Sequence, residues 1–167
     1  RKVTREQTYA LLHKMRETVP GIHLRTTLIA GHPGETEADF QDLMAFVEEM
    51  KFERLGVFPY SHEEDTYAYR HYEDDVDPEL KQERADALME LQNGISRAHN
   101  EAKVGQVLKV IVDREENGYY VGRSEFDSPE VDPEVLISST RALAPGTFYE
   151  VRITGAEDYD LFAEVAE

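Results

Sequence analysis

The feature that most constrains this fold is a strand–helix–strand pattern in residues 22–60. Residues 22–30 (IHLRTTLIA) are β-branched and apolar, and the continuous apolar run at their end predicts a parallel strand buried on both faces. Residues 36–50 then carry apolar side chains at helical spacing behind Thr36, and residues 54–60 (RLGVFPY) predict a second strand. Because two parallel strands cannot bury themselves, the βαβ unit predicts a piece of a larger α/β domain.

Further helices are predicted on both sides of this unit. Residues 4–18 form an amphipathic pattern that begins with a Thr4–Gln7 capping box. Residues 62–77 are polar, tyrosine-rich and acidic, which predicts a long loop. Residues 78–102 predict a long helix, and its inner side is expected to carry Leu80, Ala87, Leu88, Leu91 and Ile95.

After Gly105 the pattern changes to short alternating strands. They are separated by Asn-Gly, Pro and Gly, and they read QVLKVIVD, YYVGRSEF, EVLIS, TFYEVRITGA and YDLFAEV. Five such strands predict a small closed β-barrel of the OB type. The expected fold class is therefore α/β plus all-β, with segments 1–77, 78–102 and 103–167.

The charge and the amino-acid composition exclude several functions. The net charge is −17, with 12 basic and 21 acidic residues up to position 102 and 6 basic and 14 acidic residues after it. This balance disfavours nucleic-acid phosphates, and it fits either a basic protein partner or simply an acidic, soluble surface. The absence of cysteine excludes disulfides, thiolate metal sites and cysteine-bound clusters within the chain. No apolar stretch is long enough to span a membrane, and the first residue, Arg1, is expected for a fragment.

The loop Gly31-His32-Pro33-Gly34-Glu35 between the first strand and its helix is a candidate binding site. It lacks the Lys-Ser/Thr pair of a phosphate loop and the glycine spacing of a dinucleotide site, and Glu35 adds negative charge where a phosphate would lie. Ligands of α/β barrels bind at the carboxyl ends of the strands, so a ligand role and a tight turn both remain open. Arg25 either reaches a carboxylate inside a barrel or lies at a solvated strand start.

Two other polar stretches allow a functional and an ordinary interpretation. The six histidines show no metal spacing, and His62 with residues 63–65 forms either a cation site or a solvated acidic loop. Residues 122–132 (GRSEFDSPEVD) lead out of a barrel strand and are acidic, which favours a basic protein over RNA as a ligand. The alternative is an ordinary solvated loop.

Four stretches together resemble a known family. They are TTLIAGHPGETEADF, RLGVFPYSHEEDTYAY, GRSEFDSPEVD and RITGAEDYDLF, and they are similar to the C-terminal part of the radical-SAM methylthiotransferases. DSPEVD and TGAEDYDL favour the members that methylthiolate an aspartate of the small-subunit ribosomal protein S-twelve over tRNA-modifying relatives. Two positions depart from the family pattern: His32 replaces the aromatic residue of Gly-Phe-Pro-Gly, and Asp65-Thr66-Tyr67 replaces Gly-Thr-Pro.

The resemblance implies a fold and a set of cofactors. The fold would be the end of a partial (β/α) radical-SAM barrel, a connecting helix and a five-stranded, OB-like TRAM β-barrel. The whole enzyme would use S-adenosyl-L-methionine and two 4Fe-4S clusters, whose cysteines lie in upstream segments. This chain alone is therefore expected to hold no catalytic or metal-ligating residue, to bind no cofactor by itself and to be inactive.

The resemblance also implies two groups of site residues. The pocket for S-adenosylmethionine would be lined by Gly31, His32, Phe58, Pro59 and Tyr60, with Arg25 as a candidate for its carboxylate. Docking of the basic ribosomal protein would involve Arg123, Glu125, Asp127, Glu130 and Asp132. We expect a cytoplasmic location without membrane contact, and the open sheet edges predict a domain-swapped homodimer. The alternatives are a fragment of a tRNA (adenosine) methylthiotransferase and a free-standing binding module.

Overall fold

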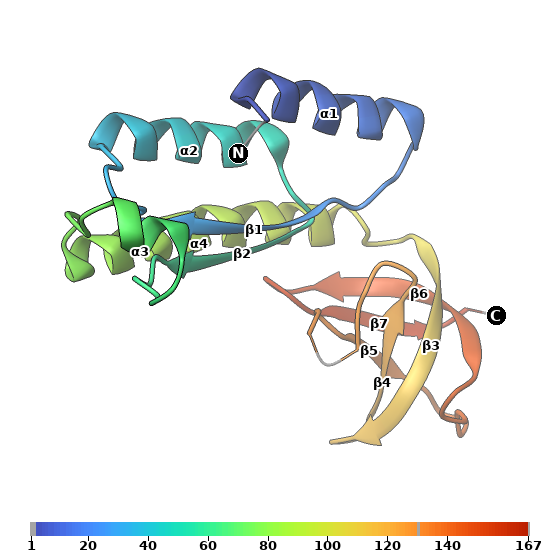
Figure 1. Cartoon of the computed structure of the whole chain (residues 1–167). Helices are drawn as coiled ribbons and strands as arrows, with labels where there is room; N and C mark the ends of the chain where they lie inside the picture. The colour runs from blue at the N-terminus through green and yellow to red at the C-terminus, as the bar shows by residue number, and fades with distance from the viewer. Residues whose placement is uncertain (1–2, 130, 167) are drawn as a thin grey trace. The chain divides into compact units, whose positions relative to one another are not determined.

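The chain contains a small α/β unit and a closed β-barrel (Figure 1). The computed structural model describes residues 3–129 and 131–166. Contacts divide the chain into two compact units, residues 1–92 and 93–167, and the division falls inside the long helix α4 (Pro78–Glu101). The predicted α/β plus all-β class is confirmed. The three predicted segments stay a prediction. No helix in the described part of the chain is long and apolar enough to cross a membrane.

Local capping sets the start of the first two helices. In α1 (Arg5–Thr18), the backbone N–H of Gln7 donates to Thr4 Oγ1 at 3.3 Å, and the N–H of Thr4 donates to Gln7 Oε1 at 3.0 Å. In α2 (Glu37–Met50), Thr36 and Asp39 make the same reciprocal pair at 3.2 and 2.9 Å. Both helices therefore begin where the sequence predicts.

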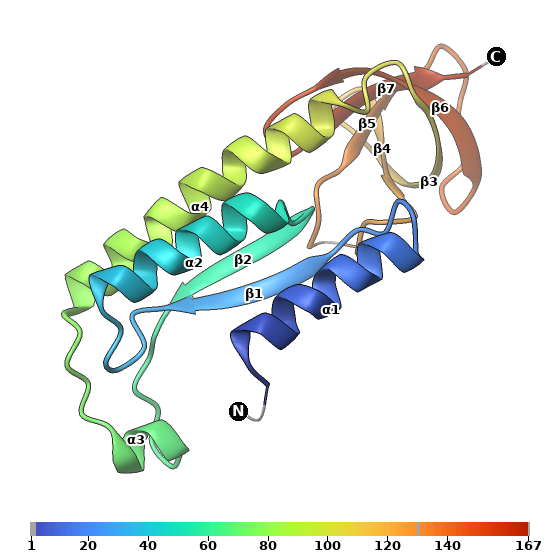
Figure 2. The same ribbon diagram turned by 90° about the horizontal axis from the view of Figure 1, so that it is seen from above.

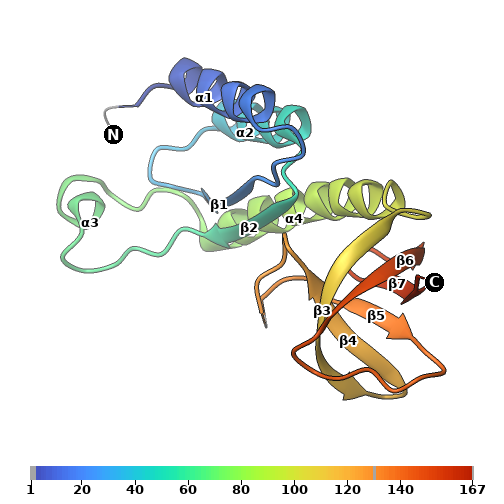
Figure 3. The ribbon, with the colours of Figure 1, turned by 90° about the vertical axis from the view of Figure 1, so that its right-hand side faces the viewer.

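The sheet of the first unit has two parallel strands, β1 (Arg25–Ala30) and β2 (Arg54–Pro59), paired from Arg25↔Arg54 to Ala30↔Pro59. Helices α1 and α2 lie on the same side of this sheet (Figures 1 and 3). An apolar cluster packs there, with Leu24, Met50 and Phe52 buried and with the Tyr9 and Phe46 rings 5.0 Å apart. The side chains of these helices thus cover one face of the two strands.

The predicted burial of the first strand on both faces is wrong. Arg25, Thr27 and Ile29 are exposed, whereas Ala30 is buried. The sheet has only these two strands among the described residues, so each strand also keeps one edge without a strand partner. The domain-swapped homodimer stays a prediction, and these edges are where it would form.

The segment expected to be a long loop contains a short helix, α3 (Tyr67–His71). Thr66 caps it by accepting a hydrogen bond from the Tyr69 N–H at 3.1 Å. The loop prediction is therefore wrong for residues 67–71. Figure 2 shows α3 beyond the carboxyl ends of β1 and β2.

Helix α4 buries a polar side rather than the predicted apolar one. Leu80 is 36% exposed, and Ala87, Leu91 and Ile95 are only half-buried. The prediction holds for Leu88 alone, because the buried side consists of Lys81, Arg84, Ala85, Leu88, Gln92, Ser96 and Asn100. Polar groups tolerate this burial when they are bonded, as when Gln92 Nε2 donates to the Phe52 carbonyl at 2.9 Å.

The second unit is a closed five-stranded barrel, as predicted. Its strands are β3 (Val107–Glu116), β4 (Tyr119–Ser124), β5 (Val135–Ser138), β6 (Phe148–Ala156) and β7 (Leu161–Val165), in the order β3-β4-β5-β7-β6 (Figure 3). Asn117 and Gly118 both have positive φ, which matches the tight hairpin turn that Asn-Gly predicts. Register shifts at Val112/Arg114 and Ile153/Gly155 bend the strands toward closure. The buried core is Val110, Val112, Val135, Ile137, Leu143, Val151, Ile153, Leu161 and Ala163.

Candidate functional site

The carboxyl ends of β1 and β2 bring together five residues predicted to line a cofactor pocket. Gly31 and His32 follow β1, while Phe58 and Pro59 end β2 and Tyr60 comes next. The Tyr60 N–H donates to the Ala30 carbonyl at 2.8 Å, and the rings of His32 and Tyr60 lie 5.2 Å apart, edge to face. These contacts hold the two loops side by side.

Arg25 does not join this group. It is the first residue of β1 and pairs with Arg54 at the amino end of the sheet. Ala30 is five positions further along the strand, about 16 Å away at roughly 3.3 Å per residue. In this structure Arg25 therefore lies at the opposite end of the strands from His32 and Tyr60.

An exposed apolar pair lies near the same strand ends. Ile29 is 55% exposed and Phe58 is 61% exposed, and the two face each other in the strand register. Because large apolar side chains are seldom left in water as adjacent pairs, this pair marks a surface suited to an apolar ligand or to further chain. Sequence reasoning missed Ile29, because the strand was expected to be buried on both faces. The available signal was the two-residue period of a strand, which places Ile29 on the same face as Thr27 and Arg25.

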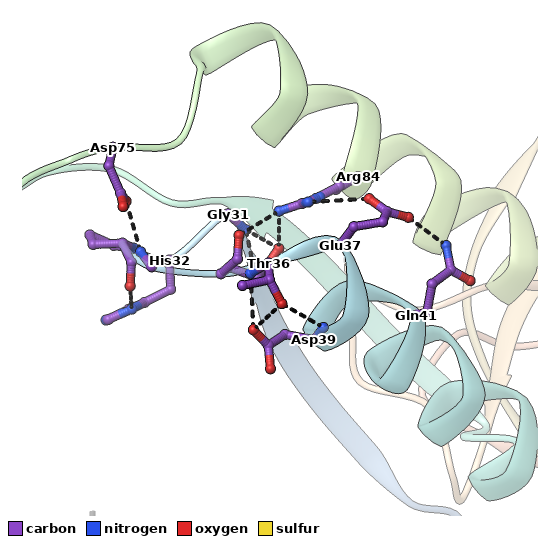
Figure 4. A network of polar contacts seen from close by, with 11 residues as sticks. Gly31, His32, Thr36, Glu37, Asp39, Gln41, Asp75 and Arg84 are labelled. Atoms are coloured by element: carbon purple, nitrogen blue, oxygen red, sulfur yellow. Dashed lines mark hydrogen bonds and ion pairs between the residues drawn. The ribbon is translucent and has the colours of Figure 1, made fainter.

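The carboxylate of Glu35 fills the position where an anion would bind, and its two partners, Gly31 and Arg84, are labelled in Figure 4. The Gly31 N–H donates to both Glu35 oxygens at 3.0 Å, and Arg84 Nη1 donates to Glu35 Oε1 at 2.9 Å. The Arg84 and Glu35 side chains are only 5% and 11% exposed. The loop is therefore a closed turn with an internal carboxylate. It is not a phosphate cradle.

A second contact from α4 reaches both strand-end loops. Lys81 Nζ donates to the two Asp74 oxygens at 2.6 and 2.7 Å and lies 5.1 Å from the Tyr60 ring centroid. A Cβ on Gly31, whose φ is +76°, would lie 2.3 Å from Lys81 Cγ. Sequence reasoning missed Lys81 and Arg84, since their partners come from distant segments. Their only signal was positive charge on a helix side otherwise expected to be apolar.

Asp75 also binds the loop that follows β1, through a hydrogen bond to its backbone. The Gly34 N–H donates to Asp75 Oδ1 at 2.7 Å. Figure 4 shows the Asp75 side chain pointing toward the loop that contains His32. The residues between β2 and α4 thus hold the loop after β1 in place. His32 remains at the outer side, with its ring 5.9 Å from Tyr72.

Carboxylates also neutralise the start of α2. Hydrogen bonds from Gln41 and then from Arg84 hold the pKa of Glu37 below its ordinary value. Hydrogen bonds from the Thr36 side chain and backbone lower the pKa of Asp39 in the same way. These negative charges complement the positive end of the helix dipole. The helix start therefore has its own internal anions.

Of the predicted docking residues of the barrel, Arg123 lies near the end of β4, whereas Glu125, Asp127 and Asp132 lie in the loop between β4 and β5. Arg123 Nε donates to Asp113 Oδ2 at 3.1 Å, so its charge is partnered within the barrel. Asp127 Oδ2 accepts hydrogen bonds from Ser124 N and Oγ at 3.3 and 2.5 Å, and Asp132 accepts one from Ser128 N at 2.6 Å. Glu125 is exposed.

Asp127 and Asp132 thus shape the loop, whereas Glu125 faces solvent. The prediction that includes Glu130 lies outside the described residues. A pocket of about 250 Å³ lies beside the loop, and Arg123, Ser128 and Asp132 are among its lining residues.

No metal site emerges from residues 3–129 and 131–166. They contain no group of three or more His, Asp or Glu side chains able to hold an ion. His62, proposed above as one possible cation ligand, has Nδ1 3.1 Å from the Tyr60 hydroxyl and its ring 4.7 Å from that of Tyr69. The tyrosine contacts account for its position.

The barrel is similar to a known family of domains. Residues 104–166 match the TRAM domain family, which agrees with the closed five-stranded architecture.

Across its whole length the chain is similar to proteins named ribosomal protein uS12 methylthiotransferase RimO. It is 58% identical to that of Parabacteroides distasonis over 165 residues, covering 99% of this chain and 38% of the relative. It is 56% identical to that of Porphyromonas gingivalis over 169 residues, covering 100% of this chain and 39% of the relative. It is 57% identical to that of Bacteroides thetaiotaomicron over 166 residues, covering 99% of this chain and 38% of the relative.

The predicted resemblance to the methylthiotransferases is confirmed by these matches, which cover 99 to 100% of this chain. The chain nevertheless spans less than two fifths of the length of these relatives, at 38 to 39%.

Proposed function

We propose that this chain is part of a radical-SAM methylthiotransferase that modifies an aspartate of ribosomal protein uS12. The observation that carries the proposal is the continuous match, at 56 to 58% identity, to three relatives of that name across 99 to 100% of the chain. The TRAM match at residues 104–166 supports it. Within such an enzyme this chain would supply part of the cofactor pocket and a docking surface for the substrate.

The strand-end residues would contribute one wall of a pocket for S-adenosylmethionine. Ile29 and Phe58 present apolar surface, and His32 and Tyr60, just after the strand ends, contribute two rings that contact each other. The Gly31 N–H is already bonded to Glu35, so this wall suits an uncharged or cationic part of the cofactor better than a carboxylate. Bound there, the cofactor would supply the radical chemistry that activates a C–H bond.

Iron–sulfur clusters do not fit the residues of this chain. The sequence contains no cysteine, so it offers no thiolate ligand. The two 4Fe-4S clusters implied by the family would depend on other segments of the enzyme. The chain's own contribution would be to bind and orient, through Lys81 and Arg84 holding the strand-end loops.

The barrel loop would dock a basic protein. Among the described residues of this loop, Glu125 is an exposed carboxylate, while Asp127 and Asp132 hold the loop backbone in shape. The 6 basic and 14 acidic residues from position 103 onward disfavour tRNA as the ligand, since phosphates are repelled by such a surface. A ribosomal substrate would place the reaction in the cytoplasm. A free-standing binding module is the remaining alternative.

The test uses the complete enzyme that contains this chain, with purified uS12 and S-adenosylmethionine. Mass spectrometry of uS12 peptides should detect replacement of one aspartate hydrogen by a methylthio group. Modification of tRNA adenosine in place of uS12 would contradict the proposal.

Docking is tested separately with Glu125→Lys, which should weaken uS12 binding and reduce its dependence on salt. Glu150→Lys makes the same charge change at another exposed barrel position and is the control. Equal binding by the two variants would remove the docking role of the loop.

A further inference from the structure

The residues around α3 form an uninterrupted series of ring contacts at the carboxyl ends of the parallel strands. The order is Tyr69, His62, Tyr60, His32, Tyr72, Tyr67 and His71, with neighbouring centroids 3.9 to 6.0 Å apart. The tightest contact is the parallel stack of Tyr67 on His71, at 3.9 Å and 10°. Three separate stretches of sequence therefore contribute to one aromatic group.

The outer members of this group are open to solvent. Tyr67 is 67% exposed, Tyr69 is 44% exposed and Tyr72 is 48% exposed. Core packing does not explain rings that remain in water to this extent. Exposed tyrosines grouped on one short element are typical of binding surfaces, because each presents a large, rigid contact area at low entropic cost. We call Tyr67, Tyr69 and Tyr72 the α3 aromatic surface.

The charge around this surface is strongly negative. Residues 61–77 contain seven carboxylates and a single arginine, Arg70. Asp65 pairs with Arg70, Asp74 with Lys81, and Asp75 accepts from the Gly34 N–H, so those three have partners within the fold. Glu64 and Glu73 lie on either side of α3 and are exposed. Their charges favour a cationic ligand and oppose a phosphate backbone.

We propose that the α3 aromatic surface binds a lysine- and arginine-rich peptide segment. The ring surfaces of Tyr67 and Tyr69 that His71 and His62 leave uncovered receive the cationic side chains, and Glu64 and Glu73 attract them from the rim. Aromatic faces bordered by carboxylates satisfy both the apolar stem and the charged end of Lys and Arg. The role of this surface in bringing a basic substrate segment to His32 and Tyr60 rests on the proposed function. The binding of a basic peptide to the surface does not depend on catalysis or on the barrel loop.

The probe is a fluorescein-labelled decapeptide in which five arginines alternate with glycine and serine. Its binding to this chain is measured by fluorescence anisotropy at low salt, and a peptide with glutamate in place of arginine is the comparison. We expect the arginine peptide to bind and the glutamate peptide not to bind. Tyr67→Ser with Tyr69→Ser should weaken binding about tenfold, because two exposed cation–π contacts are lost.

Matched variants separate ring contacts from folding and from general charge. Tyr67→Phe with Tyr69→Phe keeps both ring faces and should bind within about twofold of the unmodified chain. Tyr159→Ser removes a tyrosine that is 46% exposed in the barrel unit and should have no effect. Glu64→Gln with Glu73→Gln should weaken binding and reduce its salt dependence. Circular dichroism establishes that each variant is folded.

Equal binding by the Ser and Phe double variants would overturn the proposal. Tighter binding of a single-stranded RNA decamer than of the arginine peptide would also overturn it, since the surface would then act by base stacking. Failure of the proposed function has a different result: uS12 remains unmodified while the arginine peptide still binds through Tyr67 and Tyr69. If uS12 is modified but the tyrosine variants bind the peptide normally, this inference alone fails.

Discussion

The two units of this chain bury their interiors by different means. The barrel pairs each strand on both sides, and its core consists of nine apolar residues from Val110 to Ala163. The first unit has two strands, leaves Ile29 and Phe58 exposed, and contains the buried charged residues Glu53, Lys81 and Arg84. Among the described residues, buried charges occur only in this unit.

The difference shows what closure of a sheet provides. A closed barrel has no open edge and surrounds its own apolar core, so it requires few polar contacts for order. In the open two-stranded sheet, helices α1 and α2 cover only one face. The loops at the strand ends are held by ion pairs from α4. We therefore expect the barrel to respond to lost apolar volume and the first unit to respond to broken polar contacts.

The largest expected effect comes from Arg84→Met, which leaves the buried Glu35 carboxylate without its cation. The loss should be about 4 kcal/mol of unfolding free energy, because breaking a buried pair leaves an uncompensated charge. Hydrogen exchange followed by mass spectrometry should show faster exchange in residues 25–59 and unchanged protection in residues 107–165. Arg97→Met is the control, since its pair with Glu101 is 63% and 58% exposed. Its effect should be below about 1 kcal/mol. Equal losses would refute the role of burial.

Ile137→Ala should produce the reverse pattern. Ile137 is fully buried in the barrel core, so its truncation should cost about 3 kcal/mol through lost burial and a residual cavity. Exchange should accelerate in β3 to β7 while residues 25–59 stay protected. Leu136→Ala, at the half-buried neighbouring position, should cost about 1 kcal/mol. Similar losses at both positions would mean that the inward face of β5 is misassigned.

Gly31→Ala should cost about 2 kcal/mol, measured by urea denaturation. The new methyl group would meet the Lys81 side chain at 2.3 Å, and the residue would keep a φ of +76°. Gly34→Ala separates the two causes, because its φ is +81° and a Cβ there meets nothing within 4 Å. That variant should cost about 1 kcal/mol, from the backbone alone. No difference between the two would argue against close packing of α4 on the loop.

The smallest effect is expected from acid titration of Asp39. Its pKa is lowered in the folded state from an ordinary value of 3.8 by hydrogen bonds from Thr36. The carboxylate therefore contributes stability above pH 3.8, and this is lost as the pH falls through the lower folded pKa. NMR titration of the Asp39 carboxyl carbon should give a midpoint below 3.8, whereas a midpoint at or above that value would contradict the capping role. Asp39→Asn should remove this part of the acid sensitivity.

Several features of this protein follow from short stretches of its sequence. Thr4 and Thr36 start helices, and Asn117-Gly118 turns a hairpin, because the hydrogen bonds and dihedral angles involved join residues only a few positions apart. The alternating pattern after Gly105 determines which side chains face the barrel core. The proximity of His32 and Tyr60 also follows from the sequence, since the carboxyl ends of parallel strands meet at one edge of a sheet.

The tertiary structure decided the features that depend on distant partners. Glu35 and Arg84 are 49 residues apart, so the local sequence gives no sign that this carboxylate pairs with α4. The burial of Lys81 and the exposure of Ile29 depend equally on what packs against each face. Neighbouring residues set the start of a helix or the type of a turn. Whether a charge is buried is decided by the free energy of its contacts with segments far away in the sequence.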